Sequence, residues 1–280
     1  MRTTPPRLRR VALAVSSALF AAACFAQPVQ AESRVALVIG NSTYKISPLK
    51  NPAADAQAVA AALKSLGFDV TERENTSYRE LIELLRQFSK HGAQADVRLV
   101  FYAGHGVQAK GRNYLLPVDT EIRSEEDIPA KSADVNDLLD RLAQISRGIN
   151  IVILDACRDN PFAGSDVVLP DGRRLKFRGA TPSGLARMEA PLGTLLAFST
   201  APGGIALDDP AAAHSIYAKY LLDYLGAPGL PVEQMFKRVR AGVANDTGRM
   251  QVPWESSSLT GDFCFKAEHG TCVIASGPPR

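Results

Sequence analysis

The chain has 280 residues and carries 32 Lys and Arg against 29 Asp and Glu. Four of the basic residues and none of the acidic ones lie in residues 1–31, so the remainder holds 28 basic and 29 acidic residues. This balance excludes a net positive field over the main body, and we predict no nucleic-acid partner. About 249 residues follow position 31, enough for one large domain or two small ones.

The first 31 residues are typical of a secretory signal peptide. A basic start precedes an unbroken apolar stretch from Val11 to Phe25, and small residues follow at Val29 and Ala31. The stretch is shorter than the roughly 20 apolar residues that a transmembrane helix needs. We predict cleavage after Ala31 and a periplasmic or secreted protein with no membrane span after leader removal. An uncleaved anchor and a lipid-attachment site at Cys24 are the alternatives.

From residue 34 on, apolar runs alternate with apolar residues at helical spacing. The elements predicted up to residue 154 are, in order, a strand at 35–39, a helix at 52–66 capped by Asn51, a strand at 68–70, a helix through residue 88 capped by Ser77, strands at 97–103 and 114–118, a helix from Asp134 to Ile145 and a strand at 151–154. This succession predicts an α/β fold, with a mostly parallel sheet covered by helices on both faces.

The composition changes after the last of these strands. Residues 163–191 are rich in Gly, Pro, Ser and basic side chains, and we interpret them as a long exposed loop. A strand at 194–199 and helices at 215–225 and 232–243 follow. Phe263 and Phe265 are predicted to close the domain as an edge strand, and Trp254 to pack in the core. The segment after Cys272 reads as a frayed tail.

The cysteines outside the leader divide into a close pair and a single residue. Cys264 and Cys272 lie near the C-terminus, and in an oxidising compartment they are either bridged or two unpaired thiols. Cys157 stands alone. A leftover cysteine in an exported protein is either buried and inert or a reactive thiol.

Two predicted strands lead directly into reactive side chains. The strand at 97–103 runs into His105, which glycines flank, and the strand at 151–154 runs into Cys157. Ligand and catalytic sites of such sheets lie beyond the carboxyl ends of the strands. An imidazole beside a thiol lowers the pKa of the thiol and can later protonate a leaving amine. Alone, each residue is more often structural; together they predict a dyad, with the backbone N–H groups of Gly106 and Cys157 as the oxyanion hole.

Two segments closely resemble the catalytic segments of bacterial caspase-like peptidases, relatives of metacaspases: FYAGHG at 101–106 and ILDACRDNPF at 153–162. The separation of 52 positions from His105 to Cys157 agrees with the roughly 50 known for caspases. The resemblance extends to VALVIGN with Tyr44, to LKNP with Asp55, and to residues 193–208 and 251–255. It covers residues 34 to about 265.

The resemblance implies a caspase-like three-layer αβα sandwich with a mostly parallel central sheet. It also implies a large-subunit-like part at 34–165, a linker loop at 166–191, a small-subunit-like part at 192–268 and a C-terminal tail at 269–280. In a cysteine endopeptidase of this kind, His105 would be general base and acid, and Cys157 the nucleophile. The substrate would be a protein or peptide.

The sequence departs from true caspases just before the nucleophile. Their Gln-Ala-Cys is Asp-Ala-Cys here, and Asp159 replaces the Gly after the Cys-Arg pair. An acid at the position of Asp155 is what metacaspases show, where it helps line the pocket for the residue before the cut. Because a carboxylate favours Arg or Lys, we predict cleavage after basic residues. The alternative for Asp155 is a structural cap; for Asp208 and Asp209, it is a solvated turn instead of a second pocket acid.

The linker, the question of cofactors and one rival function remain to be considered. The basic residues of the linker, such as Arg173 and Lys176, are either self-processing sites or a flexible loop. No phosphate-binding glycine motif and no zinc-ligand spacing occurs, so we predict no cofactor and no metal; calcium dependence and oligomeric state stay open. The rival to an enzyme is a caspase-like scaffold or peptide-binding module with poor turnover. The intact dyad favours the enzyme.

Overall fold

A computed structural model describes residues 32–45, 47–122, 124–157, 166–168, 174–177, 186–202, 204, 206–208, 211–268 and 272, with the backbone alone at 157, 166–168, 174–177 and 208. All described residues belong to one compact unit, which begins at Glu32. The predicted leader and the end of the predicted tail lie outside the described residues. Within the described residues, no helix combines the length and the apolar character that crossing a membrane requires.

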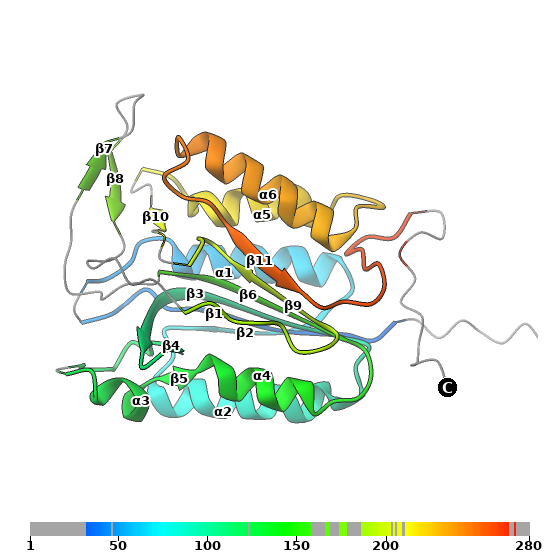
Figure 1. Ribbon diagram of the computed structural model, residues 1–280, viewed down its shortest axis with the longest axis horizontal. Helices are drawn as coiled ribbons and strands as arrows, with labels where there is room; N and C mark the ends of the chain where they lie inside the picture. Colours follow the sequence, from blue (N-terminus) through cyan, green and yellow to red (C-terminus); the bar gives the residue numbers. More distant parts are fainter. Residues whose placement is uncertain are drawn as a thin grey trace, which may run out of the picture. The chain divides into compact units, whose positions relative to one another are not determined.

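One eight-stranded sheet organises the unit that follows Ala31 (Figure 1). Its path runs β11-β9-β6-β3-β1-β2, and all pairings are parallel except that of β11 with β9. The bounds along this path are Trp254–Ser257 for β11, Thr194–Phe198 for β9, Ile149–Cys157 for β6, Val97–Ala109 for β3, Arg34–Gly40 for β1 and Asp69–Glu74 for β2. Off the path, β4 (Arg112–Leu115) pairs with the end of β3, and β5 (Ala133–Asp134) pairs with β4.

Helices cover both faces of this sheet, as Figure 1 shows. One layer holds α1 (Pro52–Ser65), α5 (Ile216–Leu225) and α6 (Val232–Asp246); the other holds α2 (Tyr78–His91) and α4 (Val135–Ala143). Strand alternation supplies each layer with its apolar contacts, since Ile151 and Ile153 pack in the first and Val152 and Leu154 in the second. The predicted three-layer α/β sandwich is confirmed. The short helices η1 (Gly92–Gln94) and α3 (Asp127–Lys131) complete the set.

Two of the three predicted N-cap residues cap their helices in the structure. Ser77 and Asp134 each accept a backbone N–H from the first turn of their helix, at 3.4 and 2.8 Å. Asn51 precedes α1 as predicted, but its side chain makes no capping hydrogen bond. Instead, Ser42 Oγ accepts the N–H of Ala53 at 3.0 Å. The cap of α1 therefore comes from the loop after β1, which links the first strand to its crossover helix.

Three predictions differ most from the structure. The strand that leads to His105 does not end before it but runs on to Ala109, where β4 pairs with it. Trp254 is 40% exposed on the edge strand β11, outside the core. Phe263 and Phe265 are not an edge strand. Both are buried in the layer of α5 and α6, because the backbone of Cys264 between them forms an isolated β-bridge with that of Pro231, just before α6.

The segment read as a long exposed loop has structure in its described parts. The strands β7 (Asp166–Val168) and β8 (Arg174–Phe177) form an antiparallel pair, and β8 pairs in turn with β10 (Leu207–Asp208). Figure 1 shows this three-stranded sheet apart from the main one. Met188, later in the segment, is buried against the α2 and α4 layer. The interpretation as exposed loop was therefore wrong for these residues.

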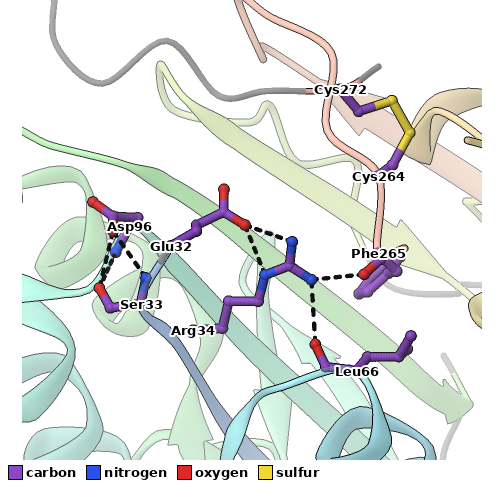
Figure 2. A network of polar contacts seen from close by, with 8 residues as sticks. All are labelled: Glu32, Ser33, Arg34, Leu66, Asp96, Cys264, Phe265 and Cys272. Carbon is purple, nitrogen blue, oxygen red and sulfur yellow. Dashed lines mark hydrogen bonds and ion pairs between the residues drawn. A yellow bond between two sulfur atoms is a disulfide. The ribbon is translucent and has the colours of Figure 1, made fainter. Parts of the chain in front are cut away.

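At the amino end of the sheet, a cluster of contacts joins the first strand to the last described segment (Figure 2). Arg34 donates to the carbonyl oxygens of Leu66 and Phe265, at 3.3 and 2.6 Å, and pairs with Glu32. The neighbouring Cys264 forms a disulfide with Cys272. The bridged alternative for the two C-terminal cysteines is therefore the one that the structure holds.

Candidate active site

The two predicted dyad positions are direct neighbours in the main sheet. The parallel pairing of β3 with β6 ends on the pair His105 and Cys157. Adjacent strands lie about 4.8 Å apart, so the backbones of these residues run side by side at the carboxyl end of the sheet. The structure brings them together from positions 52 residues apart in the sequence. Cys157 is described here by its backbone.

The imidazole of His105 is held on two sides. It is 2% exposed, and its Nε2 lies 2.8 Å from the carbonyl oxygen of Ser47. Because a carbonyl oxygen only accepts, Nε2 carries the proton in this arrangement, and in the neutral ring Nδ1 holds the lone pair. The Tyr44 ring packs against the imidazole, with the ring centroids 4.4 Å apart. A ring fixed in this way can take up and return a proton at Nδ1.

Ser47 reaches this position through an unusual backbone. Its φ of 57° lies in the left-handed region, which non-glycine residues adopt at a cost of order 1–3 kcal/mol. Such strain persists where the surroundings impose it and is frequent at functional sites. Nothing in the sequence pattern singles out Ser47, because its part in the site is played by a main-chain carbonyl.

Two tyrosine hydroxyls support the backbone around His105. Tyr44 Oη accepts the N–H of His105 at 2.9 Å, and Tyr102 Oη lies 2.9 Å from the carbonyl oxygen of the same residue. The two hydroxyls are 3.2 Å apart, and both lie within 3.0 Å of the Leu116 carbonyl oxygen. Burial raises the pKa of Tyr102 well above its ordinary value, so its hydroxyl stays protonated.

Gly104 is required by this packing. A Cβ at that position would lie 2.6 Å from Tyr44 Oη and 2.8 Å from Tyr102 Oη, too close for either hydroxyl to keep its place. The reason for glycine at this position is the close approach of two tyrosines that hold the histidine.

Asp155 lies two residues before Cys157 and is 1% exposed. Its carboxylate accepts a 2.5 Å hydrogen bond from Ser215 Oγ. Ser215 is the N-cap of α5, where its Oγ also accepts the N–H of Ala218 at 2.9 Å. Asp155 thus joins the end of β6 to the first turn of α5.

A second buried carboxylate meets the same serine. Asp55 in α1 is 0% exposed and accepts the N–H of Ser215, with both oxygens at 3.2 Å. Asp55 Oδ1 also lies 2.8 Å from His214 Nδ1. The role of Asp55 in this cluster was missed from the sequence. An acid on the buried face of an Ala-rich helix was the available signal.

Tyr217 adds a polar group to this region. Its side chain is fully buried, and its hydroxyl makes no hydrogen bond within the described part of the chain. Burial raises the pKa of Tyr217 well above its ordinary value, and the charge of Asp155 raises it further, against the opposing effect of Arg240. Its hydroxyl therefore stays neutral beside the carboxylates.

The other predicted site residues are placed by their backbones or strands. Gly106 pairs with Leu115 in β3 and β4. Asp208 lies in β10, opposite Lys176 of β8. The oxyanion hole and the pocket role of Asp208 stay predictions. In the described ranges, no group of three or more His, Cys, Asp or Glu side chains is arranged to hold a metal ion.

Comparison with known proteins agrees with this fold. Residues 33–264 match the family model of the caspase domain. The chain belongs to the caspase family. Its fold is also similar to that of caspase-1 from Spodoptera frugiperda, with a TM-score of 0.60 and 21% identity over 85% of this chain and 92% of that one.

Two curated proteins match part of the chain. The human mucosa-associated lymphoid tissue lymphoma translocation protein 1 and its mouse homologue are each 31% identical to it over 135 residues. These alignments cover 47% of this chain and 16% of the relatives, so the chain matches less than a fifth of their length.

Proposed function

We propose that the protein is a cysteine endopeptidase that works through His105 and Cys157. The observation that carries this proposal is their pairing as neighbours at the carboxyl end of a caspase-family sheet. The thiol proton of Cys157 passes to Nδ1 of His105, and the thiolate attacks the carbonyl carbon of the peptide bond. The C–N bond then breaks, His105 protonates the leaving amine, and a thioester remains. Water, deprotonated by His105, hydrolyses the thioester and regenerates the thiol.

We propose further that the cut follows Arg or Lys. Two buried carboxylates, Asp55 and Asp155, meet at Ser215, and positions 155 and 157 fall on the same face of β6. A cationic side chain entering beside Cys157 would therefore meet concentrated negative charge in a water-poor region, where ion pairs are strong. An Asp side chain would be repelled. Asp208 is the third candidate acid of this pocket.

The pairing of β8 with β10 supports the same specificity and a self-processing event. β8 carries Arg174 and Lys176, and its backbone runs antiparallel to that of Asp208. Extended peptides bind proteins by adding a strand in this manner. A basic segment of the chain thus already lies along the strand of a predicted pocket acid. We propose that the enzyme cuts its own linker after one of these basic residues.

Fluorogenic peptides that differ only in their last residue test the activity. We expect the purified protein, in the presence of a thiol reductant, to cleave after Arg and Lys at least tenfold faster than after Asp, and Cys157→Ala to cleave none. Equal rates for Arg and Asp would remove the pocket assignment. No turnover of any peptide, with or without calcium, combined with tight binding of the Arg peptide, would favour the rival function of a peptide-binding scaffold.

Mass spectrometry separates self-processing and export from the specificity. An intact linker in the active protein, under conditions where peptides are cleaved, would contradict self-processing. A new N-terminus at Glu32 in protein recovered from outside the cytoplasm would support the proposed signal peptide. A retained N-terminus or a lipid on Cys24 would favour one of the anchored alternatives.

A further inference from the structure

His214 stands beside the paired carboxylates without a part in the proposed chemistry. It lies in the segment that enters α5, and its Nδ1 is 2.8 Å from Asp55 Oδ1. The His214 side chain is 32% exposed, whereas that of Asp55 is fully buried. The imidazole therefore connects the surface of the molecule to a buried carboxylate that lies 159 positions earlier in the sequence.

The contact with His214 matters because Asp55 shares a hydrogen-bond donor with Asp155. One serine, Ser215, donates its N–H to Asp55 and its Oγ–H to Asp155, so the two acids belong to one cluster. Buried like charges are costly unless cations or donors compensate them. An imidazole hydrogen-bonded to Asp55 is such a compensating group, and a doubly protonated imidazole also supplies a positive charge.

Two further cationic side chains, Lys50 and Arg240, belong to the surroundings of the two carboxylates. Lys50 donates to the carbonyl oxygen of Ala212, at 3.3 Å, in the same segment as His214. Arg240 acts electrostatically on Tyr217, whose buried hydroxyl makes no hydrogen bond within the described residues and whose pKa also responds to the charge of Asp155. Two carboxylates and an unsatisfied hydroxyl match a guanidinium, which offers five N–H donors in a planar fork.

We propose that His214 is a specificity-determining residue, which shares Asp55 with the side chain of the substrate and sets how strongly the pocket prefers a guanidinium to a neutral group of the same shape. This inference rests on the proposed function, since it concerns the residue before the cut. A charged imidazole already neutralises part of the cluster and repels an arriving cation. A neutral imidazole keeps the hydrogen bond to Asp55 without the repulsion.

The pair arginine and citrulline isolates this effect, because citrulline has nearly the same shape and no charge. We would measure kcat/KM for peptides ending in each, with the wild type, His214→Gln and His214→Lys. Glutamine retains an N–H donor and stays neutral, whereas lysine places a permanent cation beside Asp55. The ratio of the two values for one protein does not depend on how much of that protein is folded.

We expect the arginine-to-citrulline ratio of His214→Lys to be about tenfold below that of His214→Gln, an order of magnitude set by the repulsion of two cations at close range. Asp155→Asn, the matched control, should lower the ratio below that of the wild type. Equal ratios in the Gln and Lys variants would overturn the proposal.

A binding experiment separates this proposal from the enzymatic one. In Cys157→Ala, which cannot turn over, agmatine serves as a free guanidinium probe and the histidine ring signals are followed by NMR. We expect agmatine to shift the signals of His214, identified by their loss in His214→Gln, and to leave those of the distant His91 in place. Agmatine that binds without moving the His214 signals would refute the specificity role, whatever the peptidase assay gives.

Discussion

The two ends of the parallel sheet bury charge in different ways. At the amino end, the guanidinium of Arg98 is buried and donates to Asn150 and to the backbone carbonyls of residues 92, 95 and 147. At the carboxyl end, Asp55 and Asp155 converge on one serine, next to a buried tyrosine hydroxyl that bonds to no described residue. At the amino end, each hydrogen bond of the guanidinium ends on another part of the fold. At the carboxyl end, a buried hydroxyl without a partner among the described residues is a departure of the kind found at functional sites.

The comparison predicts that substitutions at the carboxyl end change activity and those at the amino end change stability. The largest effect belongs to the dyad. We expect Cys157→Ala and His105→Ala each to lower kcat/KM for an Arg peptide by about 10³-fold or more, because either change removes the nucleophile or its base. Their melting temperatures should stay within a few degrees of the wild type.

The double variant sharpens this prediction. If the two residues act as one unit, combining the substitutions should cost no more than either does alone. Losses that add would mean that His105 and Cys157 act independently, and the dyad would be refuted even though each residue matters.

Arg98 gives the largest expected effect at the amino end. Replacing it with Met keeps most of the volume but removes a donor from the side-chain oxygen of Asn150 and from three backbone carbonyls, at a cost of about 3 kcal/mol. Burial lowers the pKa of Arg98 to about 10, so the guanidinium is still charged at neutral pH. Chemical denaturation measures the loss. If kcat/KM of the folded fraction fell as well, the division between the two ends would fail.

The two dyad residues at the carboxyl end were predicted from local motifs. The contacts that hold the residues of this site in place were not predicted. His105 and Cys157 each follow a recognisable apolar strand, so their meeting in register needed no knowledge of loops. The carbonyl of Ser47 and the contact between Asp55 and His214 depend on loop paths and on side chains far apart in the sequence. Neither kind of contact leaves a periodic pattern.

The errors have physical causes of the same kind. Phe263 and Phe265 alternate with Cys264 as in a short strand, but any extended segment gives that pattern over three residues. Their place was decided by the packing of the Phe263 ring beneath Arg34 and against the Phe265 ring, and by the pairing of Cys264 with Pro231 just before α6. Asn51 is a favourable cap by residue type, yet Ser42 reaches the first turn of α1 instead. Tertiary contacts overrode local preference in both cases.

The C-terminal disulfide should have a smaller effect, confined to stability. Cys264 and Cys272 are separated by 8 positions, and closing so short a loop is worth about 2.5 kcal/mol by chain entropy. We expect the double variant with Ser at both positions to lose that much on denaturation while keeping its kcat/KM. Reductant should affect the two ends oppositely, since it preserves the thiol of Cys157 and opens this bridge. A wild-type protein whose stability ignores reductant would contradict the assigned contribution.

Arg34 provides the smallest expected effect, and its contribution to stability can be divided into a part from charge and a part from the geometry of the guanidinium. Its guanidinium bonds to the carbonyls of Leu66 and Phe265 and stacks over Phe68 and Phe263, 5.6 and 5.4 Å from the ring centroids. Arg34→Lys keeps the charge but loses the planar fork, so we expect a loss of about 1 kcal/mol.

Arg34→Met is the matched control, since it removes the charge and keeps the stem. A loss no greater than that of the Lys variant would assign the effect to geometry, and a clearly greater one to charge. The two variants should process peptides like the wild type, because the amino end of the sheet holds the first strand against the last described segment and takes no part in the chemistry.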